Sequence, residues 1–249
     1  MPNHKIVSRE EWITKRKELL SKEKELTRLR DKLTTERQEL PWVKIDKNYL
    51  FDGPNGKESL SDLFDGKSQL IVYHFMFQTD WTEGCKSCSL IADHYEPSII
   101  HLNQRDTNMV TVSRAEFKNI ESFRKRMGWE FKWVSSFDSD FNLDFDVSFP
   151  ADPKSQKYYN YQMTTFPSSE GPGMSVFFKD ADGSIFHTYS SYSRGLEQFL
   201  GVYQLLDIVP KGRDEDGLVY GMEWVRHHDK YGDESFKDIY VELLSKRDG

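Results

Sequence analysis

The chain has 249 residues, of which 14% are aromatic, and its 34 Lys and Arg against 41 Asp and Glu give a formal charge of −7. A chain of this length and aromatic content can bury a sizeable core, which excludes a disordered protein or a small scaffold held by disulfides. The acidic balance argues against nucleic acid as a partner, and the chain lacks the run of about 20 apolar residues that a membrane span needs.

Residues 1–41 are predicted to form an amphipathic helix. Ser8 and Glu11 have the spacing of a capping box, and Pro41 ends the helical pattern. The apolar positions that recur every seven residues are Trp12, Leu19, Leu26, Leu33 and Leu40. Two interpretations of this thin seam stay open: it packs along the domain of its own chain, or it contacts a second copy in a homodimer. The Lys-, Glu- and Arg-rich start without an apolar signal sequence predicts a soluble, cytoplasmic protein.

Residues 42–210 are predicted to form an α/β domain whose sheet has parallel members, because strands and helices alternate in its first half. Pro97 lies inside the first helical pattern and should kink or split that helix. The expected elements are strand 42–50, strand 69–77, helix 88–102, strand 108–113, helix 114–127, strand 131–135, a hairpin of strands 174–179 and 184–189, and helix 195–208.

Two segments have no clear period. Residues 138–173 are predicted to be an ordered insertion, because six aromatic side chains there would be unfavourable in water. These are Phe141, Phe145, Phe149, Tyr158, Tyr159 and Tyr161. Residues 211–249 are charged and are predicted to be a C-terminal extension that ends in a short helix. His227 and His228 in this extension are expected to be solvated.

The only cysteines form the sequence Cys85-Lys86-Ser87-Cys88, directly after the predicted central strand and at the start of a helix. Positions i and i+3 share one helix face, so the two sulfurs can reach disulfide distance. The positive end of the helix dipole favours a thiolate at Cys85, whereas Cys88 lies one turn deeper on the apolar stripe. The pattern predicts that Cys85 is a nucleophile and Cys88 the resolving thiol. Lys86 should favour the thiolate, and Glu83 should oppose it.

Two other interpretations of the cysteine pair are a zinc site and a pair of inert thiols. A zinc site would need His94 and His101 as further ligands, but at 100° per residue both histidines point away from Cys85. No metal is therefore expected. Two inert buried thiols are the second alternative, and the position of the pair between a strand and a helix argues against it.

Several segments together resemble a known family: Tyr73-His74-Phe75-Met76-Phe77, Trp81 through Cys88, Glu170-Gly171-Pro172-Gly173, Phe186 through Ser190, Tyr192 through Gly195, Leu206-Asp207 and Pro210 through Glu215. They resemble the thioredoxin superfamily, nearer to its peroxiredoxin-like members. More closely, the chain resembles a bacterial thioredoxin-like family of unknown function that is labelled dithiol-disulfide oxidoreductase. The resemblance implies a mixed central sheet flanked by helices, with the N-terminal helix and the C-terminal extension as additions.

The resemblance also implies a substrate-binding role for Trp81, Gly171 and Pro172, with Pro172 at the place of the cis-proline that faces the cysteines in thioredoxin-like folds. Lys86-Ser87 replaces the Gly-Pro of thioredoxins, and Trp81 stands four residues before Cys85 rather than next to it. The expected partners are protein or small-molecule thiols and disulfides, and no cofactor is expected.

Three functions therefore stay open at the level of sequence. The first is a thiol-disulfide oxidoreductase that uses Cys85 and Cys88. The second is a peroxidase of the peroxiredoxin type, and the third is a non-catalytic binding module with a thioredoxin fold.

Overall fold

A computed structural model describes residues 4–149 and 155–232 of the chain. The chain divides into two compact units, Met1–Trp42 and Val43–Gly249, and each is described by itself. None of the helices in the described residues combines the length and the apolar character that crossing a lipid bilayer requires.

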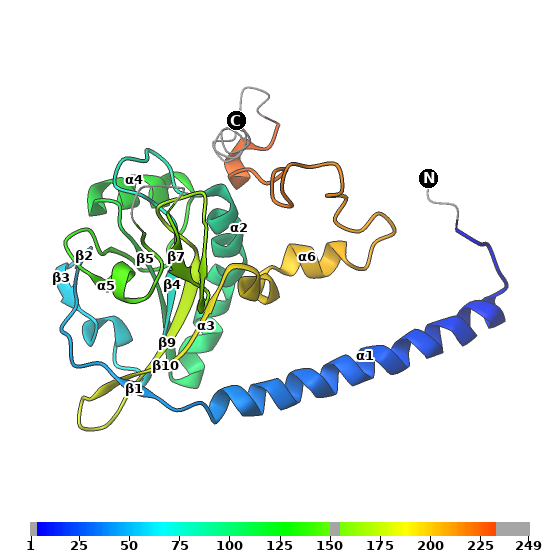
Figure 1. Ribbon diagram of the computed structural model, residues 1–249, viewed down its shortest axis with the longest axis horizontal. Coiled ribbons are helices and arrows are strands. Elements are labelled where there is room, and N and C mark those ends of the chain that lie inside the picture. Colours follow the sequence, from blue (N-terminus) through cyan, green and yellow to red (C-terminus); the bar gives the residue numbers. More distant parts are fainter. Residues whose placement is uncertain (1–3, 150–154, 233–249) are drawn as a thin grey trace. The chain divides into compact units, whose positions relative to one another are not determined.

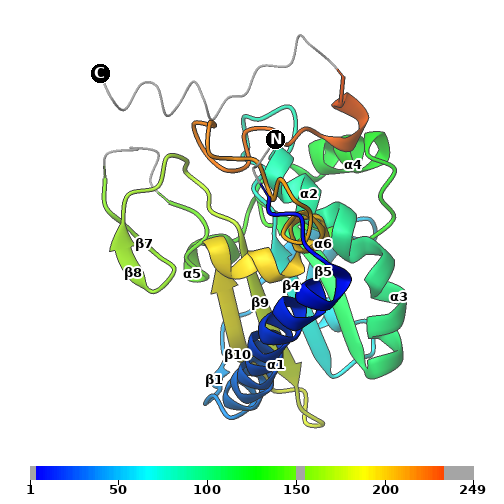
Figure 2. The same cartoon turned by 90° about the vertical axis from the view of Figure 1, so that its right-hand side faces the viewer.

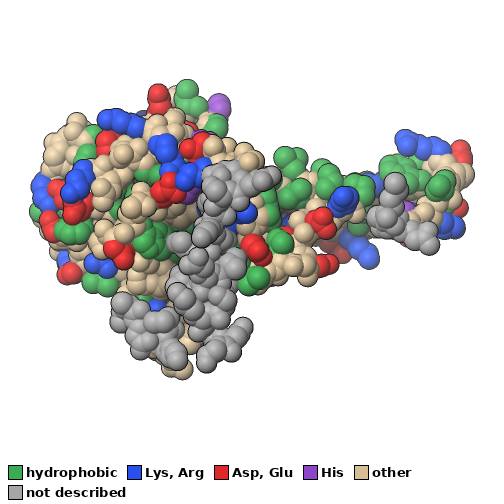
Figure 3. Space-filling view, turned by 90° about the horizontal axis from the view of Figure 1, so that it is seen from above, with side chains coloured by type: hydrophobic (Ala, Val, Ile, Leu, Met, Phe, Trp, Pro, Cys, Tyr) green, Lys and Arg blue, Asp and Glu red, His purple; other side chains and the backbone are tan. Residues whose placement is uncertain are grey.

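The N-terminal unit consists mainly of the long helix α1 (Arg9–Gln38), as predicted. The Ser8 hydroxyl accepts a hydrogen bond from the Glu11 backbone N–H at 3.2 Å, so the predicted cap is present. None of the residues of α1 is buried, and Figure 3 shows hydrophobic side chains at intervals along the helix among charged ones. Which surface the seam contacts stays a prediction.

The second unit is built on an eight-stranded sheet with the order β1-β10-β9-β4-β5-β6-β2-β3 (Figure 1). Its strands are β1 (Val43–Lys44), β2 (Leu50–Gly53), β3 (Gly56–Ser59), β4 (Gln69–His74), β5 (Thr107–Ser113), β6 (Trp133–Ser135), β9 (Gly173–Lys179) and β10 (Ile185–Tyr192). Strands β4, β5 and β6 are parallel, whereas β9 runs antiparallel to β4 and to β10. The mixed sheet with its flanking helices confirms the predicted thioredoxin-like α/β fold.

The central strand β4 is buried on both faces, which explains its nearly unbroken apolar sequence. Leu70 and Val72 point into the hydrophobic cluster on one face of the sheet. Tyr73 belongs to the larger cluster on the other face, which also contains both cysteines. The helix that carries the cysteines therefore packs on the face of the sheet to which Tyr73 belongs.

The helices lie on both faces of the sheet (Figures 1 and 2). They are α2 (Lys86–Tyr95), α3 (Ile99–Leu102), α4 (Phe117–Arg126), α5 (Phe141–Asp144) and α6 (Gly201–Leu206), with 3₁₀ turns at Asp62–Phe64, Glu96–Ser98, Asn103–Arg105, Ser193–Phe199 and His228–Lys230. Helices α2, α4 and α6 contribute side chains to the cluster that holds the cysteines, and α5 contributes to the opposite one. Pro97 separates α2 from α3 by a 3₁₀ turn, which confirms the predicted break.

Several predicted elements are shortened, shifted or divided in the structure. Strand β4 ends at His74 instead of residue 77, and the chain then enters the loop that leads to Cys85. The segment predicted as one strand, 42–50, supplies β1 and the first residue of β2. The predicted helix 195–208 starts as a 3₁₀ helix, and extended backbone at Leu200 separates it from α6.

The described part of the insertion forms regular elements. It contains α5 and a separate two-stranded sheet of β7 (Lys157–Tyr159) and β8 (Gln162–Thr164). Of the six aromatic side chains named for this segment in the sequence, four are buried, namely Phe141, Phe145, Phe149 and Tyr159, whereas Tyr158 and Tyr161 are exposed. Residues 150–154 of the insertion and the predicted C-terminal helix lie outside the described residues.

The insertion contributes directly to the core, and a substitution tests this. Phe141 is fully buried, and its ring centroid lies 5.1 Å from that of Tyr49 and 4.7 Å from that of Phe145. We expect Phe141→Ala to lower the free energy of unfolding by about 3–5 kcal/mol, because it leaves a cavity among aromatic rings.

The matched control is Leu143→Ala in the same helix, since Leu143 is 47% exposed. It should change the free energy of unfolding by less than about 0.5 kcal/mol in the same urea titration. Equal effects of the two substitutions would contradict the role of α5 in the core.

Candidate active site around Cys85 and Cys88

Cys85 is the residue that precedes the first turn of α2, and Cys88 lies within that turn. The Cys85 backbone N–H donates to the Met76 carbonyl at 3.0 Å, which ties the start of the helix to the segment following β4. The Cys85 carbonyl accepts from the backbone N–H and the hydroxyl of Ser89, each at 2.9 Å. Neither cysteine is in a disulfide, and the two residues are only 5% and 2% exposed.

The two thiols have different environments. Burial raises the pKa of the Cys88 thiol well above its ordinary value, and the contact with the neighbouring Cys85 sulfur raises this pKa further. Cys88 therefore keeps its proton at neutral pH. Cys85 occupies the position before the first turn of α2, where the helix dipole favours negative charge. The roles of nucleophile for Cys85 and resolving thiol for Cys88 stay a prediction.

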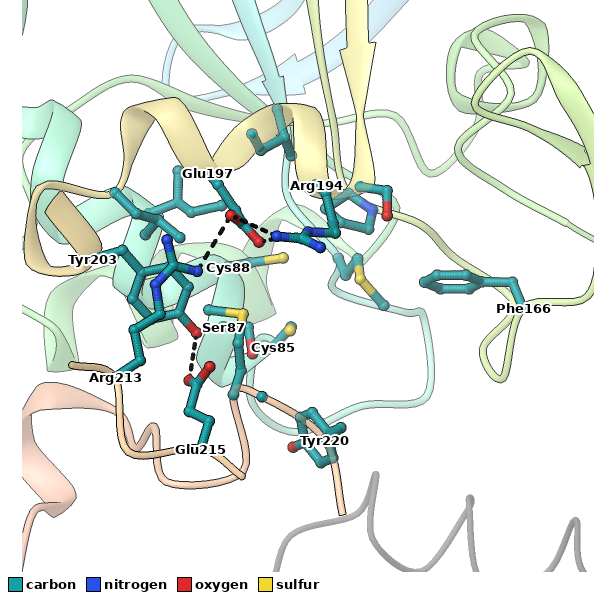
Figure 4. Close-up of a pocket in the computed structure, with 18 of the residues that line it drawn as sticks. Cys85, Ser87, Cys88, Phe166, Arg194, Glu197, Tyr203, Arg213, Glu215 and Tyr220 are labelled. Carbon is teal, nitrogen blue, oxygen red and sulfur yellow. Dashed lines mark hydrogen bonds and ion pairs between the residues drawn. The ribbon is translucent and has the colours of Figure 1, made fainter. Parts of the chain in front are cut away.

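Both cysteines line a partly enclosed cavity of about 630 Å³ (Figure 4). Three parts of the chain form its walls: the start of α2, the segment 193–203 at the end of β10, and the C-terminal residues 213–222. Phe166, Pro167 and Pro172 close it from the side of the insertion. The buried thiols thus face a space that a small molecule can occupy.

Among the described residues that line the cavity, the charged side chains are two arginines and two glutamates. Glu197 accepts from Arg194 Nε at 2.9 Å and from Arg213 at 3.3 Å (Figure 4). Glu215 accepts from the Tyr203 hydroxyl at 2.8 Å and from Trp224 Nε1 at 2.7 Å. The two positive and the two negative side chains are equal in number, so these four residues give the cavity no net charge.

Residues 213–230, here called the C-terminal strap, are fastened next to the cysteines. Lys86 Nζ donates to the Glu223 carbonyl at 2.7 Å, and His227 Nε2 donates to the Gly84 carbonyl at 2.8 Å. Lys230 Nζ donates to the Glu83 carboxylate at 2.7 Å, and Arg126 also binds this carboxylate. The strap is thus attached to the residues on both sides of Cys85.

These contacts give Lys86 and Glu83 partners that the sequence does not predict. The Lys86 side chain is 4% exposed, and its ammonium contacts the strap carbonyl and lies 5.4 Å from the centre of the Tyr220 ring. Its charge therefore serves to hold the strap. The Glu83 carboxylate is neutralised by Arg126 and Lys230, so it opposes a thiolate less than expected.

The strap itself was missed by sequence reasoning. His227 is 3% exposed and was wrongly expected to be solvated. Burial lowers the pKa of His227, so its ring stays neutral while it donates to Gly84. The apolar residues Val219, Met222, Trp224 and Val225 within this charged segment were the available signal.

The other predicted site residues are Trp81, Gly171 and Pro172, and not all of them line the cavity. Pro172 lines the cavity, but no peptide bond in the described residues is cis, so the expected cis-proline is not found. The Pro172 carbonyl accepts from the Tyr159 hydroxyl at 2.6 Å. Gly171 supports this approach, because a Cβ there would come within 2.7 Å of the Tyr159 ring. Trp81 packs on the core cluster of the cysteines and is not part of the cavity wall.

Glu170 is a buried carboxyl group that joins the loop after β4 to the segment before β9. The Ser148 hydroxyl donates to Glu170 at 3.2 Å, and the Phe77 backbone N–H also donates to its side chain. Burial raises the pKa of Glu170 to about 8, although Arg114 and these hydrogen bonds lower it. The carboxyl group is therefore protonated at neutral pH.

His94, one of the two further ligands that a zinc site would need, binds other partners. His94 Nδ1 donates to the Leu90 carbonyl at 2.6 Å, and His94 Nε2 accepts from the Val202 backbone N–H at 2.9 Å. In residues 4–149 and 155–232, no group of three or more His, Cys, Asp or Glu side chains is arranged to hold a metal ion.

Comparison with known proteins gives one family and several structural likenesses. The family described as "Bacterial protein of unknown function (DUF899)" matches residues 1–231. No curated protein matches the chain.

Three of the solved structures that match are peroxiredoxins. A peroxiredoxin Q mutant from Xanthomonas campestris has a TM-score of 0.42 and 14% identity, over 67% of this chain and 96% of that one. Peroxidoxin BcpB from Mycobacterium tuberculosis has a TM-score of 0.42 and 10% identity, over 67% and 97%. The mitochondrial 2-Cys peroxiredoxin from Plasmodium falciparum has a TM-score of 0.37 and 12% identity, over 71% and 95%.

The tether between Lys86 and the strap is open to a direct test. Lys86→Met keeps the length of the buried side chain but removes the hydrogen bond to Glu223. Because hydrogen bonds of charged groups contribute about 1.5–3 kcal/mol, we expect alkylation of Cys85 by iodoacetamide to become roughly 10-fold faster. The exposed Lys118→Met on α4 is the control and should leave the rate unchanged. An unchanged rate in Lys86→Met would show that this bond does not hold the strap.

The raised pKa of Glu170 predicts a pH dependence of stability. The folded protein keeps a proton that the unfolded chain loses near its ordinary value of 4.5. This contribution to stability is fully present below pH 4.5 and is lost as pH rises through about 8. In Glu170→Gln, the free energy of unfolding should therefore fall less over this range. The exposed Glu130→Gln should keep the slope of the unmodified protein, and a steeper slope in Glu170→Gln would contradict the assignment.

Proposed function

This chain belongs to the bacterial family of unknown function DUF899, and we propose that it is a thiol-disulfide oxidoreductase. Cys85 is the nucleophile in this proposal, and Cys88 is the resolving thiol. One observation carries it: two reduced sulfurs in contact, at the start of a helix, face a cavity.

The first chemical step is attack of the Cys85 thiolate on one sulfur of a substrate disulfide R–S–S–R′. A bond forms between Cys85 and the R sulfur, the S–S bond of the substrate breaks, and R′S⁻ leaves. The free N–H groups at the start of α2 support the thiolate that begins this step.

The second step is attack of Cys88 on the Cys85 sulfur. The Cys85–Cys88 bond forms, the mixed disulfide breaks, and the second thiol leaves as RSH with the proton that Cys88 gives up. Two electrons pass from the protein to the substrate, and an external dithiol restores the reduced pair. The high pKa of Cys88 keeps it protonated until Cys85 has reacted.

The three residues proposed for substrate binding then have different tasks. Pro172 is part of the cavity wall and contacts the substrate directly. Gly171 is a positioning residue, because its lack of a side chain lets Tyr159 reach the Pro172 carbonyl. Trp81 supports the loop before Cys85 by packing on the core.

The roles of the two cysteines are distinguished by a single-turnover experiment with 4,4′-dithiodipyridine. The reduced protein should release about two equivalents of thiopyridone, and Cys88→Ser about one, with the adduct retained on Cys85. Cys85→Ser leaves the buried, protonated Cys88, so we expect thiol release to slow by roughly 100-fold. Absorbance measures the release, and the mass of the intact protein identifies the adduct.

Thermal unfolding of both variants shows whether they remain folded. Release at the original rate in folded Cys85→Ser would contradict the role of Cys85. Hydrogen peroxide tests the peroxidase alternative, since faster oxidation of Cys88→Ser by peroxide than by the disulfide at equal concentration would favour that reaction and overturn the proposal.

A further inference from the structure

We propose that the substrate of this dithiol is a small, uncharged disulfide with an apolar body, and not a disulfide of a folded protein. The inference rests on the proposed function and specifies the substrate class of the same site. Four observations carry it: the burial of the thiols, the composition of the cavity, the attachment of the strap, and the pairing of the backbone beside Pro172 with other parts of the chain.

The position of the thiols restricts the size of the partner. Cys85 and Cys88 are 5% and 2% exposed and are reached through the cavity. Its volume of about 630 Å³ falls within the ~300–1,000 Å³ that is usual for small-molecule pockets. A disulfide of a folded protein carries its own backbone and neighbouring side chains, which this space does not admit.

The walls of the cavity favour an apolar and neutral ligand. Most of its lining is apolar, and the apolar side chains include Met76, Ile91, Phe166, Leu196, Leu200 and Met222. Arg194 and Arg213 are already bound to Glu197, and a bound anion would have to compete with this carboxylate. A charged substrate would lose its hydration without gaining a free opposite charge.

The strap closes one side of the cavity. Tyr220, Gly221 and Met222 line it, and the bond from Lys86 to Glu223 holds the segment directly beside them. The Glu215 carboxylate fastens the strap to α6 through Tyr203. A protein substrate would have to displace these contacts before it reached Cys85.

The backbone next to Pro172 is not available for strand addition. A protein substrate that docks as an extended strand needs unpaired backbone groups at its binding edge. The Pro172 carbonyl already accepts from the Tyr159 hydroxyl at 2.6 Å. Gly173 begins β9 and is paired on both sides, with His74 of β4 and Tyr192 of β10.

Three disulfides of different character test the inference on the full-length reduced protein: neutral 4,4′-dithiodipyridine, dianionic 5,5′-dithiobis(2-nitrobenzoate), and the disulfides of insulin. Each rate is divided by the rate of dithiothreitol with the same disulfide, which removes differences in leaving-group reactivity. We expect the normalised rate for the neutral compound to be at least about 10-fold above the other two.

The outcomes separate the two proposals. A normalised insulin or dianion rate equal to or above that of the neutral compound overturns the substrate class while the reaction itself stands. Rates that are the same in Cys85→Ser and in the unmodified protein overturn the proposed function instead.

A substitution in the cavity wall gives a second test. Met222→Trp narrows the cavity without changing either cysteine, and we expect it to slow the reaction with 4,4′-dithiodipyridine by roughly 10-fold. Alkylation of Cys85 by the much smaller iodoacetamide should change far less. Met163→Trp is the matched control, because Met163 is 58% exposed on β8 and lies outside the cavity.

Equal slowing in both tryptophan variants, or none in Met222→Trp, overturns the role of the cavity. If Met222→Trp fails to fold, Phe166→Ala replaces it. That variant removes an aromatic wall and should raise the half-saturating concentration of the neutral disulfide without changing iodoacetamide alkylation.

Discussion

The hydrogen bond from the Cys85 backbone N–H to the Met76 carbonyl fixes where α2 begins relative to β4. The start of the helix determines that Cys85 lies outside the first turn and Cys88 inside it. The same geometry places Cys85 at the positive end of the helix dipole, and both cysteines are buried there. Cavity, strap and proposed chemistry all depend on this single placement, because each is built around the first turn of α2.

The charged residues near the cysteines have a structural task that their sequence positions do not reveal. Lys86 and Glu83 flank the pair, and simple proximity suggests that they tune the thiolate. In the folded protein both are attached to the strap or to its partners. Because Lys86 and Glu83 are paired in this way, they influence the neighbouring Cys85 sulfur mainly by holding the strap in place. In the proposed reaction, access to the thiols then matters as much as the local electric field around them.

The sequence predicted the parts of the fold that follow from local patterns. Three such parts were found near their expected positions. They are the strand β4 with its β-branched and aromatic residues, the helix α2 followed by the break at Pro97, and the hairpin of β9 and β10. The cysteine pair was predictable for the same reason, since its spacing and its place at a helix start are local properties. The boundaries of the final helix were not, because its 3₁₀ geometry and the extended Leu200 arise from packing. The walls of the cavity were missed as well: Phe166 and Met222 lie far from Cys85 in sequence, and only long-range contacts place them there.

The cancellation of charge in the cavity has a consequence for how this family could diversify. Glu197 binds both Arg194 and Arg213, and Asp207 also binds Arg213. Loss of Glu197 would leave two arginines against Glu215 among the described charged residues that line the cavity, and therefore a net positive charge around an unchanged pair of sulfurs. A relative that differs at this one position would offer the same cavity to anionic ligands.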